Sequence, residues 1–157
     1  MSSRLFQTVR EKYGLCYSIY TAAQCFDEIG AYSICGGFEP KKTRAAIRLI
    51  VKELVKLRSR APSRQELNRT IRFVNGVFRM GLESATAQMS YYGRSFLNYG
   101  KCESPDEMVK RIAAVRPSDV RDMAAEIFRN ETASLTLVVP EEDNTTDEEW
   151  LDALSGL

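Results

Sequence analysis

The sequence contains no histidine among its 157 residues. Histidine is the commonest general base in catalytic sites and the commonest zinc ligand in proteins. Its absence excludes a self-contained Ser-His-Asp or Cys-His catalytic site. Any hydrolytic chemistry of these kinds would therefore need residues from another part of a protein.

Cysteine is scarce and scattered, with four residues that form no C-x-x-C pair: Cys16, Cys25, Cys35 and Cys102. A zinc site made of cysteines alone stays open at this point, but the spacing favours reduced thiols in the core. Long apolar runs are also missing, since none approaches the ~20 residues that cross a bilayer. No signal-peptide pattern follows Met1. We expect no membrane contact and favour a cytoplasmic location, although the compartment is unknown.

Charge is distributed unevenly, although the net charge is only +1. All 22 Lys and Arg residues precede Pro140, together with 14 acids, whereas residues 141–157 contain seven acids and no base. We interpret residues 141–157 as an acidic C-terminal tail. Such a tail is typical of a solvated, partly disordered end. In a second interpretation Trp150, Leu151 and Leu154, at helical spacing, form a terminal turn that docks on the basic body.

The first 40 residues predict a helix and then a β-hairpin. Apolar residues recur at helical spacing from Leu5 to Val9 behind a serine cap, and Gly14 ends this helix. Residues 15–23 alternate as a strand that places Leu15, Tyr17 and Ile19 on one face and Cys16, Ser18 and Tyr20 on the other. A turn leads to a second strand over residues 29–35, closed by Gly36 and Gly37.

The rest of the chain predicts mostly helices. One begins at Pro40 and runs to about Arg58, with an apolar inner stripe. Capping boxes at Ser63 and Ser104 begin two more, and the pattern between them breaks near residues 81–84 and stops at Gly100. Ser118 caps the last helix, and residues 133–139 predict a buried strand. The expected fold is α+β, an antiparallel sheet layered with several helices.

The opening stretch SSRLFQTVREKYGLCYSIY, residues 2–20, resembles the C-terminal half-domain of the pitrilysin and mitochondrial-processing-peptidase family. These are zinc peptidases with an inverted H-x-x-E-H motif. The resemblance continues in the right order through EIGAYSICGGF, APSRQELNRT, LESATAQMSYYGRSFL and VRPSDVRDMAAEIF. It covers residues 1 to about 140, which we interpret as one C-terminal peptidase half-domain.

The resemblance implies a role in substrate binding. In that family two similar half-domains enclose a chamber, and the N-terminal half carries the zinc and the glutamate base. The C-terminal half completes substrate binding, and an Arg and a Tyr in the pattern R-x-x-x-x-x-x-Y reach the substrate. Here these are Arg10 and Tyr17, as auxiliary catalytic residues. The implied partners are an N-terminal zinc-binding half-domain or a second subunit, and a peptide substrate.

The chemistry of the two residue types fits this role. Peptide hydrolysis builds negative charge on the carbonyl oxygen, and a phenol is a hydrogen-bond donor at neutral pH. A guanidinium is always charged and binds carbonyls or carboxylates as a fork. Without the resemblance, the spacing alone favours sheet packing for Tyr17 and an ion pair with a nearby acid for Arg10.

The sequence also departs from the family pattern. The H-x-x-E-H motif is absent, and so are the first strand, the helix and the glycine-rich turn that precede the opening motif in the family. We therefore expect a half-domain truncated at its N-terminus, inactive alone, with no cofactor or metal ligands of its own. The missing elements would leave sheet edge and apolar surface uncovered, which favours a homo-oligomer.

Two alternatives remain. Some members of the family are catalytically silent and serve assembly or substrate presentation, and the resemblance does not separate them from active ones. A nucleic-acid surface is the less favoured alternative. It would use a basic stripe at near-helical spacing, but aromatic residues do not interleave with that stripe, which comprises Lys41, Arg44, Arg48, Lys52 and Lys56.

Overall fold

The computed structural model describes residues 3–26, 28–140 and 145–157. The chain forms two compact units, one of residues 1–60 with 121–157 and one of residues 61–120. We call these the sheet unit and the helical unit. The sheet unit contains the candidate site.

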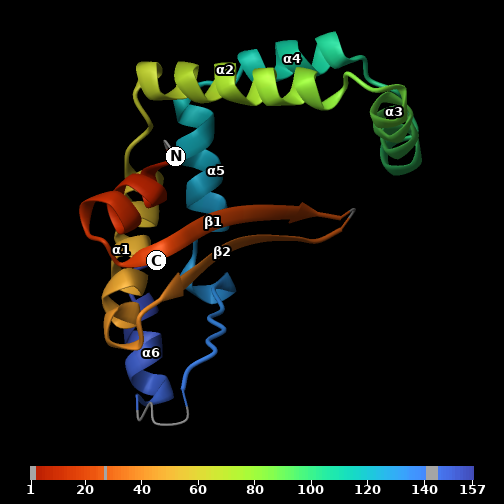
Figure 1. Cartoon of the computed structure of the whole chain (residues 1–157). Coiled ribbons are helices and arrows are strands. Elements are labelled where there is room, and N and C mark those ends of the chain that lie inside the picture. Colours follow the sequence, from red (N-terminus) through yellow and green to blue (C-terminus); the bar gives the residue numbers. More distant parts are fainter. Residues whose placement is uncertain (1–2, 27, 141–144) are drawn as a thin grey trace. The chain divides into compact units, whose positions relative to one another are not determined.

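The sheet unit opens with a helix and a hairpin (Figure 1). The first helix, η1 (Phe6–Lys12), is a π-helix, and the hydroxyl of Ser3 accepts a hydrogen bond from the Phe6 N–H at 3.2 Å. Strands β1 (Cys16–Cys25) and β2 (Gly30–Phe38) then pair in antiparallel fashion. The hairpin is where the sequence predicted it.

Strand β2 differs from the prediction at its end, because it continues through Gly36 and Gly37 to Phe38. The ring of Phe38 folds back over Gly36, where a Cβ atom would lie 2.6 Å from the ring carbon Cζ. Gly36 is therefore required for close packing of this ring rather than for a turn.

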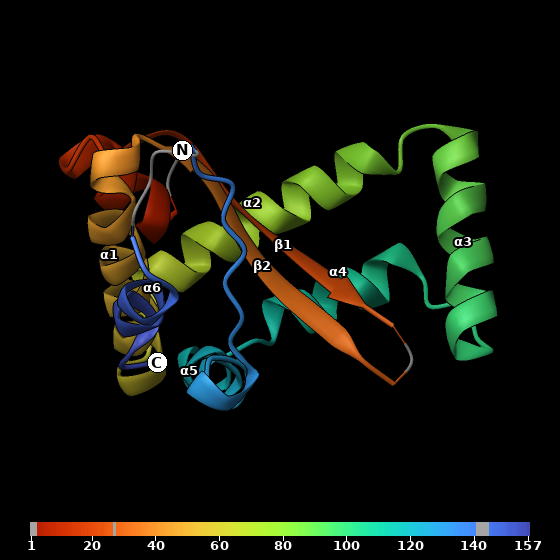
Figure 2. The ribbon, with the colours of Figure 1, turned by 90° about the horizontal axis from the view of Figure 1, so that it is seen from below.

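Helix α1 (Pro40–Ser59) is long and packs with two of its faces, and it matches the predicted span of Pro40 to about Arg58. One face contributes Ala46 to a cluster with Val9 and Ile19, against η1 and the sheet. The other face packs against the C-terminal helix α6 (Asp147–Leu154), and its cluster consists of Ile47, Val51, Trp150 and Ala153. Figure 2 shows α6 lying beside α1.

The predicted strand over residues 133–139 is wrong. These residues follow the short helix η2 (Asn130–Thr132) without regular secondary structure, and within the described residues the sheet contains β1 and β2 alone. Leu135 and Leu137 still pack on the α1–α6 cluster, whereas Val138 is fully exposed. The alternation that suggested a strand is real, but a strand also needs a neighbour for its backbone hydrogen bonds.

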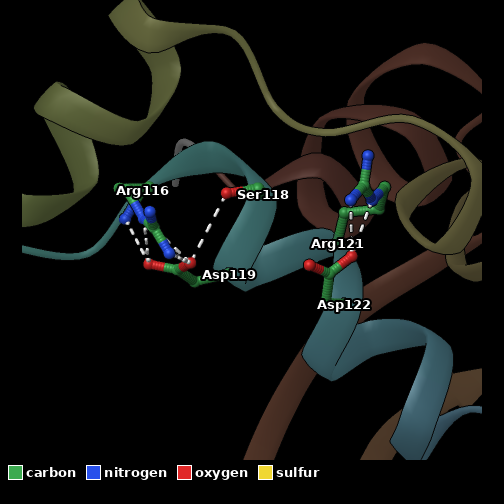
Figure 3. Close-up of polar contacts among 5 residues, drawn as sticks. All are labelled: Arg116, Ser118, Asp119, Arg121 and Asp122. Carbon is green, nitrogen blue, oxygen red and sulfur yellow. Dashed lines mark hydrogen bonds and ion pairs between the residues drawn. The ribbon is translucent and has the colours of Figure 1, made fainter.

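Helix α5 (Pro117–Ile127) begins one residue before the cap that the sequence predicted. The carboxylate of Asp119 accepts a hydrogen bond from the Arg116 N–H at 2.9 Å and also binds the Arg116 guanidinium (Figure 3). These bonds hold the pKa of Asp119 below its usual range. The Ser118 hydroxyl instead contacts Asp119 at 3.4 Å, so Ser118 is not the cap. Further along α5, Arg121 pairs with Asp122.

The helical unit contains α2 (Arg64–Gly81), α3 (Ala85–Tyr99) and α4 (Pro105–Ala113). The predicted break lies between α2 and α3, and Gly100 ends α3 with a φ of 67°. The Ser63 hydroxyl caps α2, and Ser104 with Glu107 forms the predicted capping box of α4. An ion pair of 2.9 Å between Arg79 and Asp106 joins α2 to α4.

These elements confirm the α+β fold class, with an antiparallel hairpin layered against helices. In the part of the chain that the structure describes, no helix is both long and apolar enough to cross a membrane.

Candidate substrate-contact site

Arg10 and Tyr17, seven residues apart in the sequence, are in direct contact. The guanidinium carbon of Arg10 lies 5.2 Å from the centre of the Tyr17 ring and 4.7 Å from the centre of the Phe6 ring. Both distances are in the range of favourable cation–π contacts. The guanidinium is therefore held against two aromatic rings, one from η1 and one from β1.

The turn between η1 and β1 brings the two side chains together. Gly14 has a φ of 59°, a left-handed conformation that glycine adopts without strain, and its N–H donates to the Arg10 carbonyl at 3.0 Å. The Leu15 N–H donates to the Val9 carbonyl at 3.0 Å. Since Val9 is fully buried, the backbone next to Arg10 is anchored in the core.

Tyr17 is the extra residue of a β-bulge. Cys16 lies opposite Phe38 and Ser18 lies opposite Gly37, so adjacent residues of β2 face residues of β1 that are two apart. A bulge bends the strand and turns a side chain in a new direction, and bulges are frequent next to active sites. The Tyr17 side chain is 85% exposed as a result.

Because of the bulge, the side chains that share a face of β1 differ from those that the sequence predicted. Simple alternation placed Tyr17 with Ile19 and placed Cys16 on the opposite face. In the structure Cys16 and Ile19 both belong to the cluster around Val9, and Tyr17 points to solvent. The interpretation of Tyr17 as half-buried sheet packing is therefore wrong for this structure.

Among the residues that the structure describes, Arg10 forms no ion pair. Every ion pair found there joins other residues. The neighbouring thiol of Cys16 has a pKa raised by burial, with the Arg10 guanidinium acting in the opposite direction. Cys16 is therefore a protonated thiol at neutral pH. The arrangement offers one fixed guanidinium and one exposed phenol on the same side of the sheet unit.

The residues that the structure describes do not fit a zinc site. Within the described segments, no group of three or more His, Cys, Asp or Glu residues could hold a metal ion. The four cysteines are free thiols, and two of them, Cys25 and Cys102, lie exposed.

We expect the isolated chain to bind no stoichiometric zinc, because it lacks imidazole ligands and its thiols are dispersed. Elemental analysis after a chelator wash checks this expectation. One zinc ion retained per chain would contradict it and would require a site made by association of chains.

The described part of the acidic C-terminal segment, residues 145–157, packs against α1 through α6, as the second interpretation of this segment predicts, and residues 141–144 lie outside the described part. Thr146 and Glu149 form a capping box at the start of α6, and these hydrogen bonds, with Arg44, hold the pKa of Glu149 below its usual range. Arg44 pairs with Glu149 at 3.0 Å and Arg48 pairs with Asp152 at 2.6 Å. Two cations of the basic stripe, Arg44 and Arg48, thus form ion pairs with carboxylates of the same chain.

Comparisons with known proteins agree with the fold and with the opening motif. Residues 1–74 match the family described as "Peptidase M16 inactive domain". An uncharacterized zinc protease of Streptomyces coelicolor is 35% identical over 143 residues, which are 91% of this chain and 31% of that protein. An uncharacterized zinc protease of Bacillus subtilis is 32% identical over 140 residues, 89% of this chain and 34% of that protein.

Solved structures show the same fold. A conserved protein from Enterococcus faecalis V583 matches with a TM-score of 0.68 and 25% identity, over 78% of this chain and 28% of that one. A chain in the structure of complex III2 from Candida albicans with Inz-5 bound matches with a TM-score of 0.71 and 20% identity, over 80% of this chain and 30% of that one.

The hairpin, the helices and these matches together define the class of the chain as a C-terminal half-domain of the M16 peptidase type. The recognition made from the sequence is confirmed: the chain is a C-terminal M16 peptidase-like domain. It spans about a third of the length of the curated relatives that it matches.

Proposed function

We propose that this chain is the substrate-binding half of a zinc-dependent endopeptidase. In this proposal it completes a chamber whose other wall is an N-terminal half-domain or a second subunit. The zinc and the glutamate base belong to that other half, since the described residues of this chain include no group that could hold a metal ion. The chain is inactive alone and associates through the surfaces that its partner half would cover.

The observation that carries the proposal is the contact between Arg10 and the exposed ring of Tyr17 at 5.2 Å. A guanidinium that stacks on aromatic rings keeps its N–H groups at the edge of its plane free to donate hydrogen bonds. We assign these N–H groups to the carbonyl oxygens of a bound peptide. The guanidinium thereby positions the peptide, and it also opposes negative charge as that charge develops.

In the same proposal, Tyr17 donates its hydroxyl hydrogen to the oxygen of the scissile carbonyl. The carbonyl oxygen is a weak acceptor in the substrate and a strong one when it becomes an oxyanion. A rigidly held donor therefore stabilises the transition state more than it stabilises the bound substrate. The bulge at Tyr17 supports this role because it holds the phenol away from the sheet and in reach of a ligand.

The proposal predicts that Arg10→Ala, in an intact peptidase that contains this domain, raises KM and lowers kcat together. Hydrogen bonds to charged groups contribute about 1.5–3 kcal/mol, so kcat/KM should fall about tenfold to a hundredfold. Steady-state kinetics on one peptide substrate measure both constants.

Two variants serve as controls for Arg10. Arg10→Lys keeps the charge but loses the planar fork, so it should recover only part of the loss. Lys12→Ala removes an exposed cation from the same helix and should leave both constants nearly unchanged. Equal effects of Arg10→Ala and Lys12→Ala would contradict the assignment, because they would indicate only a general influence of positive charge.

A further inference from the structure

Helix α1 carries a strip of apolar residues bordered by cations, and α6 covers one part of it. Trp150 and Ala153 of α6, 8% and 1% exposed, pack on this strip at Ile47 and Val51. At its border lie the ion pairs of Arg44 with Glu149 and of Arg48 with Asp152. An acidic amphipathic helix is thus the kind of segment that this surface accepts.

The strip continues past α6 toward the end of α1. There an open groove of about 540 Å³ lies between the second half of α1 and the last residues of the chain. Its apolar part comes from Val51, Val55 and Ala153, and Lys52, Lys56, Ser59, Ser155 and Gly156 are among the residues that line the rest. The groove lies within the sheet unit.

The charge pattern of the covered part repeats in the open part. Arg44, Arg48, Lys52 and Lys56 follow one another at intervals of four residues, so they share one side of the helix. The first two meet carboxylates of α6. Lys56 contacts Glu53 of its own helix at 2.6 Å, whereas in the described part of the chain no ion pair includes the exposed Lys52.

We propose that the open groove binds an acidic amphipathic peptide segment of a partner protein, with α6 remaining in place. Carboxylates of that segment would meet Lys52 and Lys56, and an apolar side chain between them would cover Val55, which is only half-buried, whereas Val51 is already covered by α6. An acidic segment is favoured because the groove carries lysine side chains. An amphipathic one is favoured because the groove continues the surface on which α6 packs. A nucleic-acid backbone fits less well, because it would place phosphates near Asp152 and would not cover Val55.

The test uses the full chain and a fluorescein-labelled synthetic peptide, TTDEEFLDALSGL. This peptide copies residues 145–157 with Phe in place of Trp150, so the only tryptophan in the mixture belongs to the protein. Fluorescence anisotropy should show saturable binding, and a peptide with Lys in place of each acid should not bind. The emission of Trp150 should stay unchanged, because the bound peptide does not displace α6.

Matched charge reversals locate the binding site on α1. Lys52→Glu, in the groove, should weaken peptide binding at least about fivefold, since a like charge replaces an attractive one. Lys41→Glu makes the same change in net charge at the exposed first turn of the same helix and should leave binding unchanged. The Trp150 emission of each free variant verifies that α6 is still docked.

Three results would overturn the proposal. One is the absence of saturable binding up to millimolar peptide. Another is an equal loss in Lys52→Glu and Lys41→Glu, which would mean attraction to the positive charge of the chain in general. The third is a red shift of Trp150 emission on binding, which would place the peptide on the α6 half of the strip. The proposal does not depend on peptidase activity, so it stands or falls separately from the assignment of Arg10 and Tyr17.

Discussion

Tyr17→Phe, in an intact peptidase that contains this domain, is expected to lower kcat about a hundredfold or more, as loss of one oxyanion donor does. The change removes one hydroxyl and keeps the ring on which the Arg10 guanidinium stacks. The hydroxyl acts mainly when charge has developed on the carbonyl oxygen, so KM should change much less than kcat. Steady-state kinetics with one peptide substrate measure both constants.

This substitution should hardly change the stability of the folded state. The Tyr17 side chain is 85% exposed, and exposed substitutions usually change the free energy of unfolding by less than about 0.5 kcal/mol. Tyr13→Phe is the matched control, since Tyr13 is also exposed and lies just past the end of η1. Full activity in a correctly folded Tyr17→Phe enzyme would end the catalytic assignment of this residue. A lowered melting temperature with intact activity would instead give Tyr17 a structural role.

Local features of the fold could be predicted from the sequence because their causes are local. The capping box of Ser104 and Glu107 and the stop at Gly100 depend on residues within one helical turn. The span of α1 likewise follows from a proline at its start and a sustained apolar period. The hairpin follows from two alternating runs with a turn between them.

Features that depend on a partner strand were not predictable in the same way. The bulge at Tyr17 exists only in the register of β1 against β2, and the alternation of residues 15–23 contains no sign of it. The stretch 133–139 shows the reverse case, because it alternates like a strand but has no ladder among the described residues. The contact of Arg10 with Tyr17 depends on the tight turn at Gly14, and its functional role stays a prediction.

The docking of α6 could be predicted only as one of two interpretations. Its composition is that of a solvated tail, and its apolar residues are few. The sequence predicts an apolar stripe on α1, but it does not show that one part of this stripe, at Ile47 and Val51, packs against Trp150. Two ion pairs, of Arg44 with Glu149 and of Arg48 with Asp152, lie at the border of this contact.

Trp150→Ala is expected to release α6 from α1. Removing a buried tryptophan side chain typically costs about 3–5 kcal/mol. An eight-residue helix does not persist alone in water, so its stability comes from this contact. We expect α6 to detach while the rest of the sheet unit stays folded, so the loss should be limited to the free energy of docking. We therefore expect fast amide exchange in α6 and near-normal exchange in the hairpin.

Leu151→Ala separates docking from helix propensity. Leu151 lies on the same helix next to Trp150, but it is 63% exposed, so its truncation should cost well under the effect of Trp150→Ala. Both variants replace an apolar side chain with alanine, the best helix former, and neither weakens α6 as a helix. The ion pairs of Arg44 and Arg48 are exposed and contribute little when the apolar contact is gone. If hydrogen exchange showed α6 equally protected in Trp150→Ala, Leu151→Ala and the unmodified chain, the apolar contact would not be what holds it. If α6 were unprotected in all three, the tail would be solvated, and the groove beside it would lose one of its walls.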